Sequence, residues 1–253
     1  MTKTLRAIGV GLLLLGLANS AAADVVLYVQ SPLVYPPGQF PAGHDLVWSS
    51  MPFPPSPGFA GGTSLAYDSF RLSSPSLINT VTWEGGYFGP PTQVPITNFT
   101  LTFYNDAGGK PGTALATSVI PFANANQTNL HNEIGSTGAN VLVADYSANL
   151  PTSFLANDNT PYWLSIQANI PGYGANQPTQ WGWHIGQGGD GTSIQDFVGA
   201  PPNQLGIVRP NDLAFSLIGV ANVIPEPTSL AAWATIGLAG LAYGWRRRKI
   251  TAA

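Results

Sequence analysis

Residues 96–106, ITNFTLTFYND, decide the fold class because apolar and polar side chains alternate through them. Phe99, Leu101 and Phe103 form the apolar side of the pattern, and threonine or tyrosine residues stand between them and after them. A period of two is typical of a β-strand that buries one face. This segment therefore predicts a strand with three apolar side chains in the core.

Two more segments carry the same period. PYWLSIQAN, residues 161–169, places one set of side chains on each face: Tyr162, Leu164 and Ile166 against Trp163, Ser165 and Gln167. LINTVTW, residues 77–83, places four side chains on one face: Leu77, Asn79, Val81 and Trp83. Similar runs are separated by turn clusters such as NDAGGKPG (105–112) and GQGGDG (186–191), which favour tight connections.

These patterns predict nine or ten short strands in an all-β fold, an antiparallel β-sandwich that is jelly-roll-like, over residues 24–222. The composition agrees, since 29 glycines and 23 prolines accompany only 8% charged residues. Long helices contain few glycines and prolines, so this composition argues against a helical fold. The Pro-rich residues 32–62 are expected to form a long ordered loop within this domain.

The charges of the central span exclude one class of partner. Residues 24–224 hold three basic and eleven acidic side chains, and a domain of that balance repels phosphate backbones, so no nucleic acid is expected to bind. Cysteine is absent. Disulfides, thiolate metal sites and cysteine nucleophiles are therefore excluded.

The first 23 residues have the pattern of a secretory signal peptide. Lys3 and Arg6 precede an apolar run of about a dozen residues, and Ala21 and Ala23 supply the small residues that a signal peptidase recognises. We expect cleavage after Ala23 and export of the chain.

Residues 223–253 combine three features in order. Pro225, Glu226 and Pro227 lie in the motif 225–229, residues 229–245 carry no charge, and a basic cluster follows, made of Arg246, Arg247, Arg248 and Lys249. As a helix, the uncharged segment is marginal for a hydrocarbon core of about 30 Å. We expect transient membrane insertion with the basic cluster in the cytoplasm.

This ordered set resembles the PEP-CTERM sorting signal. The resemblance implies recognition and removal of the tail by an exosortase-type membrane protease, in a cell-surface, extracellular-matrix or exopolysaccharide setting. The central span, roughly residues 65–220, is also similar to a recurrent β-sandwich domain of secreted bacterial proteins that has no assigned activity.

No catalytic residue is predicted. His44, His131 and His184 are far apart and lack the spacing of metal or catalytic motifs, and no Gly-x-Ser-x-Gly, dinucleotide or P-loop motif occurs. Glu84 and Glu133 are the only glutamates of the central span, and nothing in the sequence pairs them.

Two candidate binding sites remain. Asp190 and Asp196, in GGDGTSIQD (188–196), offer oxygen ligands that suit calcium, although the segment has no EF-hand spacing. Trp181 and Trp183, with Trp163, are candidates for a carbohydrate-binding platform if they are exposed; if they point inward they belong to the core, and this interpretation is favoured.

The sequence thus predicts an exported, non-catalytic structural or adhesive protein of the cell surface or extracellular matrix. The alternative is a carbohydrate-binding module, with or without calcium, whose ligand would be exopolysaccharide.

Overall fold

The structure is a computed structural model of residues 1–253, and it describes residues 23–36, 39–41, 44–53, 55, 61–89, 92–171, 179–199, 204–221 and 237. The regular structure of residues 23–221 is antiparallel β-structure with one 3₁₀ turn, η1 (Phe122–Asn124), among the described residues, and Gly237 is helical. The all-β antiparallel prediction is confirmed. Among the described residues, no helix has the length and hydrophobicity needed to span a membrane.

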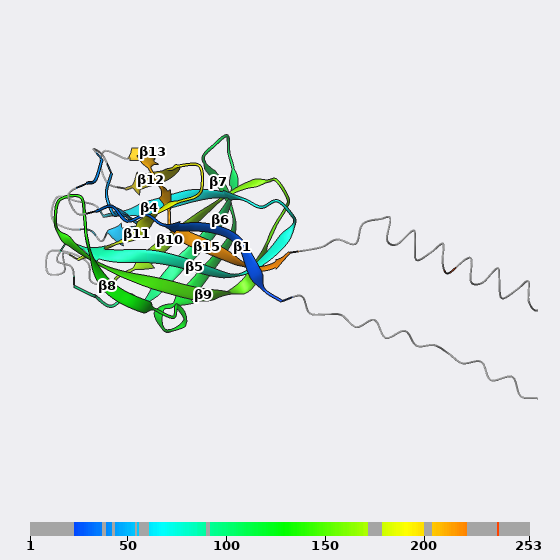
Figure 1. Ribbon diagram of the computed structural model, residues 1–253, viewed down its shortest axis with the longest axis horizontal. Coiled ribbons are helices and arrows are strands. Elements are labelled where there is room, and N and C mark those ends of the chain that lie inside the picture. The colour runs from blue at the N-terminus through cyan, green and yellow to red at the C-terminus, as the bar shows by residue number, and fades with distance from the viewer. Residues whose placement is uncertain are drawn as a thin grey trace, which may run out of the picture.

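The described strands form two sheets (Figure 1). The larger sheet has the order β14-β11-β1-β15-β5-β9-β8, with β2 beside β11. Its strands are β1 (Val25–Pro32), β2 (Val47–Ser49), β5 (Ser76–Phe88), β8 (Thr128–Ile134), β9 (Asn140–Ala156), β11 (Gln180–Gln187), β14 (Asp212–Leu213) and β15 (Phe215–Ala221). Because β11 also pairs with β5, the strands β11, β1, β15 and β5 close into a small four-stranded barrel.

The smaller sheet has the order β13-β12-β4-β10-β6-β7, with β3 beside β4. Its strands are β3 (Met51–Phe53), β4 (Gly62–Arg71), β6 (Asn98–Asp106), β7 (Pro111–Pro121), β10 (Pro161–Asn169), β12 (Thr192–Val198) and β13 (Gln204–Pro210). Fifteen strands are therefore present in the described part of the chain, more than expected. The Pro-rich segment 32–62 is not one loop, because it contains β2 and β3.

One hydrophobic core joins the inner faces of both sheets. Phe99, Leu101 and Phe103 of β6 are buried in it, as the alternation predicts. The two faces of β10 are also as expected: Tyr162, Leu164 and Ile166 lie in the main core, and Trp163 packs on the other side with Tyr67 and Ile194.

The face assigned to residues 77–83 needs correction at one end. Val81 and Trp83 face the core, but Ile78 is buried there in place of Leu77. The ladder between β5 and β9 shifts register between Ile78 and Thr80. An extra residue at such a bulge reverses the side-chain alternation beyond it, which a strict period of two cannot anticipate.

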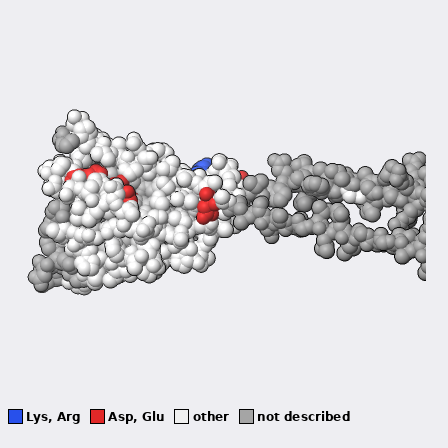
Figure 2. All heavy atoms as spheres, turned by 60° about the horizontal axis from the view of Figure 1, so that its bottom comes forward, with Lys and Arg blue, Asp and Glu red and all other residues white. Residues whose placement is uncertain are grey.

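The two ends of the domain meet. Val25 at the start of β1 pairs with Gly219 near the end of β15, so the start of β1 and the end of β15 lie at the same end of the domain (Figure 1). Figure 2 shows a face made mostly of residues other than Lys, Arg, Asp and Glu, with acidic side chains more prominent than basic ones.

Candidate functional site

A groove of about 580 Å³ lies on the smaller sheet, between the β6–β7 hairpin and the loop that joins β11 to β12. We call it the hairpin groove. The ends of β4 and β10 form its floor, and the polar groups that line it include Arg71, Asp106 and Asp190. These three groups come from turns or strand ends far apart in the sequence, so only the fold brings them together.

One wall of the groove is fixed by Trp163. Its Nε1–H donates a 2.8 Å hydrogen bond to Asp106 Oδ1. That hydrogen bond lowers the pKa of Asp106, and hydrogen bonds from the Gly109 and Gly108 amides act in the same direction against a small effect of burial. Asp106 is therefore an ionised acceptor at the edge of the groove.

Asp106 also organises the turn that carries it. Its carboxylate accepts hydrogen bonds from the Gly108 and Gly109 amides, and both glycines have positive φ, 73° and 79°. Only glycine adopts such angles readily. The interpretation of NDAGGKPG as a hairpin turn is confirmed.

Asp190 in the opposite wall belongs to a cluster of three aspartates. Asp190 is exposed to the groove, whereas Asp68 of β4 and Asp212 of β14 are buried, and one carboxylate oxygen of each lies within 4.8 Å of the others. Asp212 accepts hydrogen bonds from the amides of Gly189 and Gly191, at 2.8 and 2.7 Å. The buried Asp212 thereby holds the loop between β11 and β12 in place.

Asp68 is enclosed by donors. It accepts hydrogen bonds from the amides of Ser69 and Leu213, and the Gln30 side-chain amide is oriented to donate to the same carboxylate at 2.8 Å. Burial raises the pKa of Asp68 well above its ordinary value, although the backbone hydrogen bonds oppose this. Protonation of Asp68 therefore stabilises the folded state. This stabilisation is fully present below the pKa that Asp68 has in the unfolded chain, and it is lost as the pH rises through the higher pKa of the folded state.

Of the two predicted calcium ligands, Asp190 and Asp196, only Asp190 belongs to this aspartate cluster. Asp190 joins Asp68 and Asp212, but Asp196 does not belong to the cluster: its carboxylate accepts a hydrogen bond from the Gly206 amide. The buried members already have backbone donors, so these hydrogen bonds hold the cluster together. Calcium at Asp190 stays a prediction.

Comparison with known proteins identifies the family of this domain. The family model described as "Domain of unknown function (DUF7901)" matches residues 28–196. The chain belongs to the DUF7901 family. No curated protein and no solved structure matches it. The matched range includes Arg71, Asp106, Trp163 and Asp190 of the hairpin groove.

The structure of the DUF7901 domain corrects the candidate tryptophan platform. Trp181 and Trp183 are completely buried in the main core, so neither ring can stack on a sugar. The core interpretation agrees with this burial, and Trp183 Nε1–H donates to the Ala214 carbonyl at 2.9 Å. Gly182 between them is required, since a Cβ there would lie 2.9 Å from the Trp48 carbonyl oxygen.

Trp163 differs from the other two because it lines the groove, yet only 4% of its surface is exposed. Its ring is covered by neighbouring side chains of the outer cluster. Trp163 can therefore shape a ligand site and orient Asp106, but it does not offer an open face for stacking.

Sequence reasoning missed a second convergence in the DUF7901 domain. Glu84, Glu133 and His184 lie together, with their ligand atoms within 4.8 Å of one another. The alternation of strands could place His184 opposite Trp183, and Glu84 opposite Trp83. The alternation could not show that these strands are neighbours. Motifs of local histidine spacing also cannot detect ligands that are 49 and 51 positions apart in the sequence.

The terminal predictions fall almost entirely outside the described residues. This applies to Ala21, to the motif Pro225, Glu226 and Pro227, and to the basic cluster Arg246–Lys249. Of the predicted processing sites only Ala23 is described, and it is exposed just before β1.

Proposed function

We propose that this protein is an exported component of the cell surface or extracellular matrix, with a non-catalytic structural or adhesive domain. The observation that carries the proposal is the pair of terminal segments around one DUF7901 domain: a signal-peptide pattern before it and a sorting-signal pattern after it. Since β1 and β15 leave the domain at the same end, a tether there would leave the remainder of the domain free to contact a matrix.

The proposed fold is a jelly roll within a β-sandwich. Support comes from the strand orders β1-β15-β5-β9 and β4-β10-β6-β7, one in each sheet. Taken along the chain, these eight strands pass between the sheets as two antiparallel Greek keys do. In this view β2, β3, β8 and β11–β14 are additions to the eight-stranded core.

The sorting part of the proposal predicts a processing event. The full-length chain, produced in a host with an exosortase-type protease, should lose its tail and its membrane association. Deleting residues 224–253 should abolish surface retention, and replacing both Pro225 and Glu226 with alanine should block processing. Immunoblotting of membrane and surface fractions measures both effects. Identical processing of the double-alanine variant would contradict the proposed role of the motif.

Carbohydrate binding is the second candidate function, and the hairpin groove favours it. The groove combines one guanidinium, two carboxylates and the backbone of Gly188 and Gly189 around the edge of Trp163. Groups fixed in this way can donate to and accept from several hydroxyls of one saccharide. Exopolysaccharide is therefore the proposed ligand class, bound through hydrogen bonds more than through ring stacking.

This candidate predicts specific losses on substitution. Arg71→Ala and Asp190→Asn should each weaken polysaccharide binding by about tenfold or more, because a hydrogen bond to a charged group contributes about 1.5–3 kcal/mol. Titration of the purified chain against a panel of neutral and acidic polysaccharides measures this.

The matched control is Lys110→Ala, which removes one positive charge from the same hairpin region outside the groove lining. It should leave the affinity unchanged. An equal loss for Arg71→Ala and Lys110→Ala would point to nonspecific charge attraction. No binding to any polysaccharide would eliminate this candidate.

A further inference from the structure

A second polar site lies on the outer face of the larger sheet. Glu84 on β5, Glu133 on β8 and His184 on β11 place their ligand atoms within 4.8 Å of one another. Glu84 and His184 are almost completely buried, and Glu133 is half-buried. Such groups are rarely buried without a partner that satisfies them.

The register between β11 and β5 brings Glu84 and His184 close together. Trp183 of β11 pairs with Gly85 of β5, so the residues next to them, His184 and Glu84, lie opposite each other where the pairing ends. Both tryptophans beside these residues, Trp83 and Trp183, point into the core. Their neighbours therefore point outward, towards Glu133 on β8.

Hydrogen bonding fixes the tautomer of His184. Its Nδ1 lies 2.7 Å from the Ile185 carbonyl oxygen, which can only accept, so Nδ1 carries a proton and donates it. The Nε2 lone pair then faces the cluster. A ring held by a backbone carbonyl in this way is the usual arrangement of a metal-binding histidine.

Three buried acceptor atoms remain without any hydrogen-bond partner: His184 Nε2, Glu84 Oε2 and Glu133 Oε2. His184 Nε2, the nitrogen that faces the cluster, lies 3.5 Å from Glu133 Oε2. Two ligands of a tetrahedral zinc ion, at about 2.0–2.1 Å from it, are about 3.3–3.4 Å apart. The spacing suits a shared ion better than a charge-assisted hydrogen bond, which is about 2.7–2.9 Å long.

One cation and three carboxyl groups lie at the cluster. His131 contacts two acceptors, the Asn129 carbonyl at 2.7 Å and Glu133 Oε1 at 2.9 Å, so both of its ring nitrogens donate and it carries a positive charge. Three carboxyl groups face this one cation: Glu84, Glu133 and Asp145, the residue paired with Glu84 on β9.

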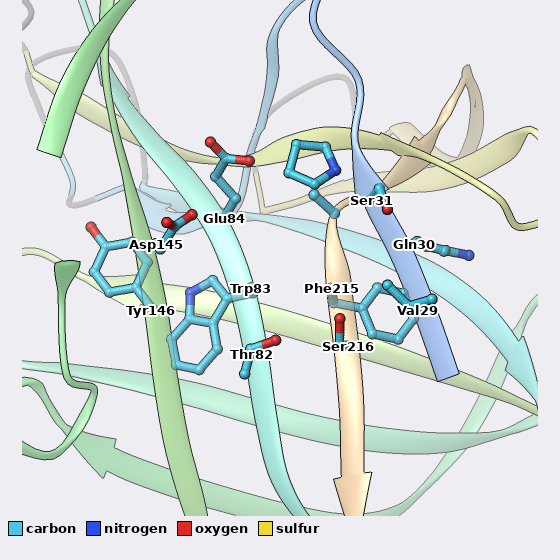
Figure 3. A pocket seen from close by; sticks show the side chains of 12 residues that line it. Val29, Gln30, Ser31, Thr82, Trp83, Glu84, Asp145, Tyr146, Phe215 and Ser216 are labelled. Carbon is cyan, nitrogen blue, oxygen red and sulfur yellow. The ribbon is translucent and has the colours of Figure 1, made fainter. Parts of the chain in front are cut away.

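A cleft of about 170 Å³ borders one member of this cluster, Glu84. It lies against β1, β15, β5 and β9, and both Glu84 and Asp145 belong to its lining. Figure 3 shows these two side chains on neighbouring strands beside the cleft. An ion could enter from this side, and a solvent molecule could complete its coordination.

We propose that Glu84, Glu133 and His184 bind one divalent transition-metal ion of the zinc class, with His131 as the residue that positions Glu133. One imidazole nitrogen and two carboxylate oxygens form a donor set that suits zinc, and three protein ligands leave one position open. The site is separate from the hairpin groove and does not depend on the function proposed for it.

Isothermal titration of the purified, chelator-treated full-length chain with Zn²⁺ tests this site. We expect one high-affinity equivalent, which is lost in Glu133→Gln and in His184→Gln. His131→Asn should weaken binding by roughly 10–100-fold, as the loss of an outer hydrogen-bond partner does. Bound Co²⁺ should give a visible absorption band in the wild type that disappears in Glu133→Gln.

Two control variants complete the design. His44→Ala removes the one histidine that is neither a proposed ligand nor a hydrogen-bond partner of one, and Asp190→Asn alters the separate aspartate cluster; both should bind Zn²⁺ like the wild type. Circular dichroism checks folding, and Glu133→Gln decides the result if His184→Gln does not fold. The proposal fails if the wild type binds no Zn²⁺ at micromolar concentrations, or if folded Glu133→Gln binds it equally well.

Discussion

Replacing Trp181 with alanine is expected to lower the free energy of unfolding by about 3–5 kcal/mol. Trp181 is among the largest completely buried side chains of the domain. Its ring packs edge-on against Phe99 of the opposite sheet, with the centroids 5.3 Å apart, and it also contacts Tyr146 of β9. Truncation would remove this contact and leave a cavity between the sheets, which the rigid strands cannot close.

Urea denaturation followed by far-ultraviolet circular dichroism measures this effect without relying on tryptophan fluorescence. Trp181→Phe should cost less, because it keeps an aromatic ring against Phe99. Val208→Ala is the surface control: Val208 is 63% exposed, so its truncation should change the free energy by less than about 0.5 kcal/mol. An unchanged midpoint for Trp181→Ala would show that the ring does not belong to the core.

Local alternation was sufficient to predict much of this core. Phe99, Leu101 and Phe103 on β6, and the two faces of β10, follow directly from a period of two. The prediction was wrong at Leu77, where a bulge reverses the faces. Bulges arise from the fit between neighbouring strands, so the pattern of one strand does not contain the information needed to place them.

The candidate sites were harder to predict because each is assembled from distant strands. Asp190 was recognised as a possible ligand from its Gly-rich turn, but its partners are Asp68 and Asp212, not Asp196. Glu133 and His184 are likewise brought close together only by the arrangement of their strands in the sheet. A single sequence reports local preference well, whereas the neighbours of a strand depend on the packing of the whole chain.

Gly85→Ala should test how tightly Trp181 is enclosed. A Cβ at Gly85 would overlap the Trp181 ring and would lie 3.0 Å from the Gly182 carbonyl oxygen. Because the ring is held between two sheets, we expect a loss of about 1–3 kcal/mol from overpacking. This exceeds the gain of about 0.4–1 kcal/mol that alanine brings by restricting the unfolded chain. Urea denaturation measures the difference.

Gly135→Ala is the matched control, since the nearest atoms to its added Cβ lie 3.4 Å away and it should cost little. The double variant Gly85→Ala, Trp181→Phe makes the test specific. If the overlap with the indole causes the loss, the smaller ring should leave room for the methyl group, and the two substitutions should then cost less together than separately. Strict additivity would instead assign the cost of Gly85→Ala to the backbone of β11, and the contact with Trp181 would not be the reason for glycine at this position.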